Sequence, residues 1–293
     1  MIAAFAEHMR AERGFSSHTV RGRCWILRRF LGRLGATTGE LHGLTIARLD
    51  ELFLELIGPG GYSRTSARHY AGSLRAFFRF AETRGWCRAG LAVAIQAPRV
   101  YSQTSVPAGP SWDDVKRLLA ATEGDRPADI RDRAILLLLA VYGLRAGDVT
   151  RLRLDDLDWE RERLTVTGPK NGRARTSPLT RPVGDAILRY LRETRPATTR
   201  REVFLSLAAP VRPLGHLWHV VGPRLRRLGV SLPRHGPHAL RHACATHLLA
   251  QGLSLTAIGD HLGHCDPDAT RIYAKVDLAG LRRVADLDLG GLQ

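Results

Sequence analysis

Six residues in the second half of the chain have side chains suited to phosphate chemistry: Arg145, Lys170, His238, Arg241, His264 and Tyr273. Two arginines can hold the non-bridging oxygens of a phosphodiester and stabilise the charge of a pentacoordinate transition state. A deprotonated tyrosine is a nucleophile that forms a phosphotyrosine, and histidines exchange protons near neutral pH. A lysine can donate a proton that an arginine retains. The combination predicts phosphoryl transfer through a covalent phosphotyrosine, for which no metal ion is needed.

Each of these residues, taken alone, also has a structural explanation. Arg145 follows a buried apolar run, where an arginine commonly pairs with a helix dipole. A single histidine is usually structural, and a single tyrosine in a helix usually belongs to the core. The prediction of chemistry therefore depends on the whole set, whose members perform complementary steps of one reaction.

The composition indicates a protein that binds a polyanion. The 293 residues include 44 Lys plus Arg against 28 Asp plus Glu, which gives a formal net charge of +16. Such a surface suits nucleic acid. Hydrophobic residues make up 44% and charged residues 25%, the balance of a folded globular protein, and the length predicts two domains. Only three of the basic residues are lysines, which makes Lys170 distinctive.

Nothing in the sequence predicts a membrane or secreted location. The longest apolar run, Ala134 to Leu144, is far shorter than the roughly 20 residues that a bilayer requires. The first residues do not resemble a secretion signal. Four cysteines form no C-x-x-C pair: Cys24, Cys87, Cys244 and Cys265. We therefore expect a reduced cytoplasmic location.

Residues 1–97 have helical periodicity and predict an all-helical domain that binds DNA. One helix is expected after a cap at Ser17 or Thr19, and others over Thr45 to Ile57 and over Ser63 to Arg84. Several arginines at helical spacing, and two on a later hairpin, are candidates for phosphate contact: Arg21, Arg28, Arg64, Arg68, Arg75, Arg79, Arg173 and Arg175. The alternative for each is an ordinary solvated helix face.

Residues 98–110 are rich in proline and predict a linker, followed by a second domain over 111–293. Ser111 should cap the first helix, and a buried helix should run from Asp129 to Tyr142. Further along, the pattern predicts a hairpin of 163–168 and 173–179 around Asn171-Gly172, a helix over 183–194, a short strand at 203–205 and helices from 214 onward.

The order of these motifs resembles the tyrosine recombinase, or phage integrase, family, including its Xer-like members. The motifs are G-L-R at 143–145, a lysine on a hairpin, H-x-L-R-H at 238–242, L-G-H at 262–264 and a tyrosine nine positions on. In the N-terminal domain, residues 15–19 resemble the family's G-x-S-x-x-T helix entry, and residues 71–86 resemble its final DNA-clasping helix. The resemblance thus covers nearly the whole chain, while the second domain carries the diagnostic residues.

The resemblance implies a site-specific DNA recombinase or integrase. Tyr273 would attack the scissile phosphate, forming a 3′-phosphotyrosyl link while the two arginines hold the phosphate. His238 would assist proton removal, His264 would bond a phosphate oxygen and Lys170 would protonate the leaving 5′ oxygen. No cofactor, ATP or divalent ion is implied. The resemblance does not distinguish chromosome resolution, phage integration, cassette exchange and transposition.

The implied fold is mainly α with a small β-sheet. An all-helical, SAM-like core-binding domain would precede a mixed α/β catalytic domain of the DNA breaking-rejoining type. The implied partner is double-stranded DNA with a specific recombination site, bound by a homo- or hetero-tetramer in a bacterial cytoplasm, at the nucleoid. A tail helix over 277–292 would pack on a neighbouring protomer, or alternatively on its own domain.

Two residues depart from the family pattern. Asp148 stands where the family usually has glutamate. The carboxylate that supports Arg145 is therefore on a side chain one methylene shorter. The hairpin reads Gly168-Pro169-Lys170, with one residue more before the lysine than the usual G-K-G.

The same residues are also compatible with functions other than recombination. His238, His242 and His247 share a helix, with His261, His264 and Cys265 close behind, which could indicate a zinc site. Residues 243–262 could instead form a helix-turn-helix of a non-catalytic DNA-binding regulator. A type IB topoisomerase or a transposase would use the same chemistry.

Overall fold

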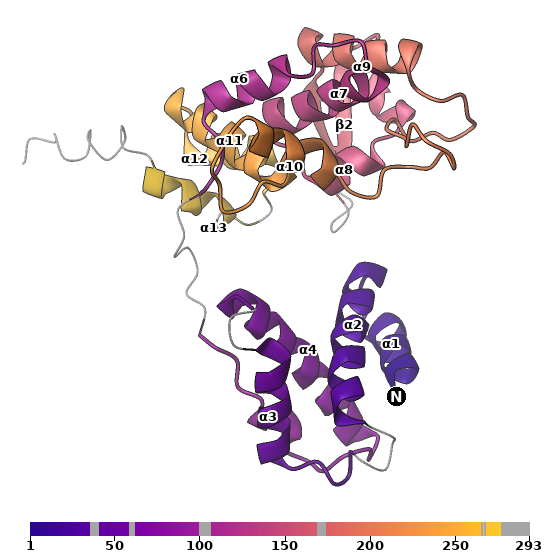
Figure 1. Cartoon of the computed structure of the whole chain (residues 1–293), viewed down its shortest axis with the longest axis vertical. Helices are drawn as coiled ribbons and strands as arrows, with labels where there is room; N and C mark the ends of the chain where they lie inside the picture. Colours follow the sequence, from indigo (N-terminus) through magenta and orange to yellow (C-terminus); the bar gives the residue numbers. More distant parts are fainter. Residues whose placement is uncertain are drawn as a thin grey trace, which may run out of the picture. The chain divides into compact units, whose positions relative to one another are not determined.

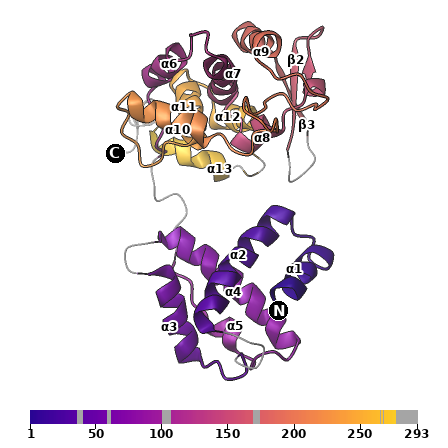
Figure 2. The same ribbon diagram turned by 45° about the vertical axis from the view of Figure 1, so that its right-hand side comes forward.

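The computed structural model describes residues 1–35, 41–58, 62–99, 107–168, 174–264, 266 and 268–276. The chain divides into two compact units, Met1–Ser102 and Gln103–Gln293 (Figures 1 and 2). Among the described residues, no helix is both long and apolar enough to cross a membrane.

The described part of the N-terminal unit is helical. Its helices are α1 (Ile2–Ala11), α2 (Ser17–Leu34), α3 (Ile46–Ile57), α4 (Arg64–Thr83) and the short α5 (Leu91–Ala94). The hydroxyls of Ser16, Thr45 and Ser63 each cap a helix by accepting a hydrogen bond from the main-chain N–H three residues later. The cap of α2 is therefore Ser16, and the prediction that Ser17 or Thr19 caps this helix is wrong. Phenylalanines from α1, α2 and α4 pack edge to face in the core.

The C-terminal unit is built around a buried helix and a small sheet. Its elements are α6 (Trp112–Ala120), α7 (Pro127–Val141), α8 (Ala146–Arg151), a 3-10 turn η1 (Leu154–Asp156), β1 (Leu157–Asp158), β2 (Arg163–Thr167), β3 (Ala174–Pro178), α9 (Arg181–Glu193), α10 (Trp218–Arg227), α11 (Pro237–Ala250), α12 (Leu255–Leu262), α13 (Asp268–Arg271) and η2 (Ile272–Val276). The strands are antiparallel in the order β1-β2-β3. The predicted fold class, mainly helical with a small sheet, is confirmed.

Helix α7 is buried along almost its whole length and packs against α9 and α11. At its end, the Tyr142 hydroxyl donates to Pro178 O at 2.8 Å and accepts from Thr180 N at 3.0 Å. This phenol fixes the end of the central helix to the end of β3, so the hairpin is positioned relative to the residues that follow α7.

A group of buried charges fastens α10 to α7. Arg224 contacts Asp129 Oδ1 at 3.0 Å and Asp132 Oδ2 at 2.8 Å, while Arg131 donates to Asp132 Oδ1. Asp129, Arg131 and Asp132 are buried, and Arg224 is partly buried. Part of the arginine content therefore serves internal packing rather than a DNA surface.

Two local features differ from the sequence-based expectations. Residues 203–205 are fully buried, yet they form an isolated bridge between Leu205 and Pro213 instead of a strand of the sheet. The strand β1 has two residues, which is too short to produce an alternating pattern, so the sequence does not predict it.

Candidate active site

Arg145 is placed by a sharp turn after α7. Gly143 has a φ of +56°, and a Cβ at this position would collide with the Leu262 side chain, so a residue without a side chain is required. Arg145 is the N-cap residue of α8, and its Nη2 donates to Gly263 O at 3.3 Å. The Asp148 carboxylate accepts from the Arg145 main-chain N–H at 3.3 Å. Asp148 thus supports the arginine through its backbone.

Arg241 lies deeper, on α11, with 2% of its surface exposed. Its two terminal nitrogens donate to Gly143 O at 2.5 Å and to Leu262 O at 2.9 Å. Burial, together with the positive charge of Arg145, lowers the pKa of Arg241 to about 10, so the guanidinium stays protonated at neutral pH. The two bonds to main-chain carbonyls fix its orientation.

A third arginine lies at the C-terminal end of α12, beside Arg145 and Arg241. Arg175, on β3, donates to His261 O. Three arginines from three elements therefore bond three successive carbonyls at the C-terminal end of α12: Arg175 to His261, Arg241 to Leu262 and Arg145 to Gly263. The last carbonyls of a helix have no partner within it and carry a partial negative charge, which favours such cations. This set is called the arginine cluster below.

Three histidines surround the arginine cluster. His238 is exposed near the start of α11, and its ring lies 4.4 Å from that of His242, one turn later. His264 follows the end of α12, and its Nδ1 lies 2.6 Å from the Thr270 hydroxyl. Burial and the nearby arginines lower the pKa of His264 to about 4, and burial with His238 lowers that of His242 to about 4. Both rings are neutral at pH 7.

The Tyr273 side chain is buried, with 2% of its surface exposed. Its hydroxyl lies 3.0 Å from His242 Nδ1. Burial raises the pKa of Tyr273 to about 12. With the phenol near 12 and the imidazole near 4, the proton stays on the tyrosine. The structure therefore holds the predicted nucleophile as a neutral phenol beside His242.

The structure thus brings together five of the six predicted catalytic residues: Arg145, His238, Arg241, His264 and Tyr273. Lys170 lies outside the described residues, as do Arg173, the 277–292 tail and the middle of the predicted linker. The strands that flank Lys170 form the predicted hairpin, with Thr167 opposite Ala174.

Sequence reasoning did not assign a catalytic role to His242, Thr270 or Arg175. His242 lies one turn after His238, so helical spacing alone places the two rings on one face. Thr270 precedes Tyr273 by three residues, and no pattern in the sequence signals its contact. The sequence predicts that Arg175 contacts DNA from the hairpin, and in the structure its guanidinium belongs to the arginine cluster.

The histidines of the predicted zinc alternative have other contacts. His261 Nε2 lies 3.0 Å from Val141 O, and the His247 ring stacks on Trp112 with centroids 3.8 Å apart. His242 contacts Tyr273, and His264 contacts Thr270. Within the described ranges, no group of three or more His, Cys, Asp and Glu side chains could hold a metal ion.

Comparison with known proteins decides the family. The model of the phage integrase family matches residues 111–279, and that of the phage integrase N-terminal SAM-like domain matches residues 2–85. The chain belongs to the phage integrase family of tyrosine recombinases. It is a site-specific recombinase that cleaves and rejoins DNA.

Relatives and solved structures are similar along most of this recombinase. Tyrosine recombinase XerC of Mycobacterium leprae is 32% identical over 98% of this chain and 97% of its own. Tyrosine recombinase XerA of Thermococcus kodakarensis is 31% identical over 98% and 94%. The crystal structure of XerH bound to palindromic difH substrate has a TM-score of 0.71 at 18% identity, covering 98% of this chain and 84% of that one. This structural likeness confirms the fold.

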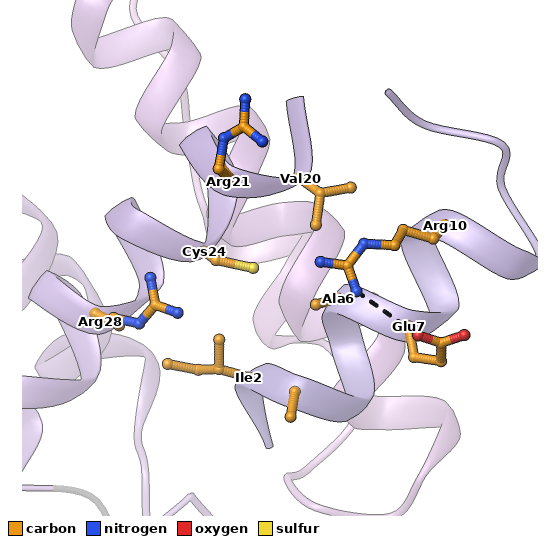
Figure 3. Close-up of a pocket in the computed structure, with 9 residues that line it drawn as sticks. Ile2, Ala6, Glu7, Arg10, Val20, Arg21, Cys24 and Arg28 are labelled. Carbon is orange, nitrogen blue, oxygen red and sulfur yellow. Dashed lines mark ion pairs between the residues drawn. The ribbon is translucent and has the colours of Figure 1, made fainter. Parts of the chain in front are cut away.

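The N-terminal unit of the recombinase carries arginines along single helix faces. On α2, Arg21 and Arg28 are exposed, seven residues apart, and line a shallow groove between α1 and α2 that also contains Arg10 (Figure 3). Residues 64, 68, 75 and 79 follow one stripe of α4. Three of these arginines are exposed, while Arg75 donates from Nε to Ile95 O at 2.8 Å. Arg75 therefore has a structural contact within its own unit.

The neutral histidines predict a pH-dependent stability of the recombinase. His242 and His264 have a pKa of about 4 when folded and an ordinary value near 6.5 when unfolded. Between these values the unfolded chain binds more protons, so stability falls as the pH is lowered from about 6.5 towards 4. We expect a lower Tm at pH 5 than at pH 7 in thermal unfolding.

The variant His242→Asn/His264→Asn isolates this contribution from that of other groups. It should lose less of its Tm between pH 7 and pH 5 than the wild type does. A Tm difference equal to that of the wild type would show that these two rings do not titrate as described.

Proposed function

We propose that Tyr273 is the nucleophile and that Arg145 and Arg241 hold the scissile phosphate. The tyrosine oxygen attacks phosphorus, the bond to the 5′ oxygen breaks, and a 3′-phosphotyrosyl link forms. His264 donates a hydrogen bond to a phosphate oxygen, and Lys170 protonates the leaving 5′ oxygen. The observation that carries the proposal is the convergence of the arginines and His264 on the end of α12, close to Tyr273.

The arginine cluster supports this assignment through its charge. Its hydrogen bonds within the cluster go to neutral carbonyls. Asp148 is the carboxylate that acts on Arg175 and Arg241, and one negative charge offsets only part of the charge of three guanidiniums. A phosphodiester brings one negative charge, and the transition state adds more. Preorganised guanidiniums stabilise that developing charge without rearranging first.

The tyrosine must lose its proton as it attacks. His242 contacts its hydroxyl, but an imidazole with a pKa of about 4 cannot ionise a phenol with a pKa of about 12. We propose that His242 holds Tyr273 protonated until DNA binds. The phosphate then raises the basicity of His238 and His242 by adding negative charge, and His238 assists removal of the proton.

We also propose a DNA partner, an assembly and a location for the reaction. The substrate is double-stranded DNA with a specific site, contacted by the arginine stripes of α2 and α4 and by the hairpin. A homo- or hetero-tetramer exchanges strands, and the 277–292 tail packs on a neighbouring protomer. We place the reaction at the bacterial nucleoid, with no metal ion or ATP.

The test uses the wild-type protein and duplexes that it selects from a random-sequence pool. A nick near the cleavage point lets the short 5′-hydroxyl fragment leave, which traps the intermediate. We expect a denaturant-resistant adduct on the 3′ side, formed equally well in EDTA, and a new 5′ end that polynucleotide kinase labels without phosphatase treatment.

The remaining alternatives give other results. A non-catalytic regulator would select a site and form no adduct. A type IB topoisomerase would form the adduct and relax supercoiled DNA, yet produce no four-way junction between two duplexes. An adduct that EDTA abolishes would contradict metal-independent chemistry.

A further inference from the structure

Thr270 is buried beside the site, and its hydroxyl contacts the catalytic candidate His264. Thr270 is 3% exposed, and its Oγ1 lies 2.6 Å from His264 Nδ1. It belongs to α13, three residues before Tyr273, and α13 continues directly into η2. One short segment therefore carries both the nucleophile and the partner of His264.

The end of α12 and the packing of α13 against it both position this contact. Gly263 has a φ of +66° and ends α12, and the next residue, His264, donates its main-chain N–H to Gly259 O at 2.9 Å. A Cβ at position 259 would lie 2.9 Å from Thr270 Oγ1, so only glycine allows α13 to approach α12 this closely. The positions of the imidazole and the hydroxyl are therefore fixed by the packing of the two helices.

The direction of this hydrogen bond decides what His264 can offer to DNA. A neutral imidazole carries one proton, and the bond made by one nitrogen sets the state of the other. If Thr270 O–H donates to Nδ1, the ring proton is on Nε2 and can be donated to a phosphate oxygen. If Nδ1–H donates to Thr270, Nε2 presents a lone pair, which a phosphate oxygen repels.

We propose that Thr270 is a positioning residue that donates to His264 Nδ1 and holds the proton on Nε2 for donation to the scissile phosphate. The proposal rests on the proposed role of His264. The hydroxyl contacts His264 Nδ1 at 2.6 Å, which is within reach of a hydrogen bond donated by its proton. The neutral state of the ring, whose pKa is about 4, is the state in which this choice matters.

The arrangement also couples two parts of the reaction. Any displacement of α13 that moves Tyr273 also moves Thr270 away from His264. The hydrogen-bond donor for the phosphate is therefore oriented only while the nucleophile segment is docked.

The test compares Thr270→Val, which removes the hydroxyl at nearly constant shape, with Thr270→Ser, which keeps it. The nitrogen chemical shifts of 15N-histidine-labelled protein without DNA report the tautomer, and the signal missing from His264→Gln identifies His264. We expect the Nε2–H form in the wild type and in Thr270→Ser, and its loss as the dominant form in Thr270→Val.

Single-turnover cleavage of the nicked duplex gives a second readout. Thr270→Val should cleave about 10- to 100-fold more slowly at unchanged DNA affinity, as is usual when the partner of a functional histidine is removed. Thr270→Ser should cleave at close to the wild-type rate. In a His264→Gln background, Thr270→Val should cause no further loss, because its effect acts through the ring.

Several results would overturn the proposal. One such result is an unchanged tautomer of His264 in Thr270→Val. Another is a rate loss in the His264→Gln background equal to that in the wild-type background, since such a loss would show that Thr270 acts only through packing. Thr270→Ala, which adds no methyl group against Gly259, repeats both measurements if the valine variant does not fold. Failure of the wild type to form any adduct would instead contradict the proposed function, and the tautomer measurement would still judge this inference.

Discussion

Tyr273→Phe should bind the selected DNA site with the affinity of the wild type and form no covalent adduct. The substitution removes one oxygen, the proposed nucleophile, and leaves the buried ring in place. No other atom of the side chain can bond phosphorus. The adduct is measured on the nicked duplex by denaturing electrophoresis, and the affinity by mobility shift at a fixed salt concentration, because phosphate contacts are salt-dependent.

The matched control is Tyr190→Phe, which also removes a buried hydroxyl. Tyr190 accepts a hydrogen bond from Leu205 N at 3.1 Å, away from the arginine cluster. Each variant leaves the partner of the lost hydroxyl unpaired, which costs about 1–3 kcal/mol for a buried group, but only Tyr273→Phe should lose the adduct. An adduct that persists in Tyr273→Phe would assign the nucleophile to another residue.

Arg241→Lys should cleave the nicked duplex at least about 100-fold more slowly and should also unfold more easily. A lysine keeps the charge but cannot bond two carbonyls and a phosphate with one fixed fork. Loss of one preorganised donor to a transition state costs about 100- to 1,000-fold in rate. Gly143 O and Leu262 O also lose their partner, which costs about 1–3 kcal/mol for each buried group left unpaired.

Arg145→Lys separates the two effects. Arg145 is exposed and makes one carbonyl bond, so its replacement should slow cleavage comparably while lowering the Tm much less. Arg181→Lys, at an exposed arginine of α9 that pairs with Asp185 at 3.7 Å, is the control that should change neither value. Normal cleavage by Arg241→Lys would remove this residue from the proposed phosphate clamp.

Local signals in the sequence were enough to predict most elements. Ser111 caps α6 as expected because a capping serine acts on its own first turn. The hairpin strands follow from alternation and a tight-turn pair. Residues 203–205 were misassigned because a short apolar run reads the same in a strand as in a buried loop, and tertiary packing decides between them.

The sequence also supplied the members of the site but not their contacts. The motif order indicated Arg145, Arg241 and Tyr273, since residue type and spacing carry that information. The burial of Tyr273 against His242, and the bond between His264 and Thr270, depend on how α11, α12 and α13 pack together. Such contacts join distant segments and leave no periodic trace in one sequence.

The end of α12 has a consequence for tolerance to mutation. Every amino acid has a main-chain carbonyl, so no substitution at His261 or Leu262 can delete the acceptor of Arg175 or Arg241. Substitutions there act only by shifting the helix end. Had the cluster been held by carboxylates, a single codon change could have released an arginine. The carbonyls that orient these cations thus persist when the side chains of their residues change. Substitution of an arginine, in contrast, removes the cation itself.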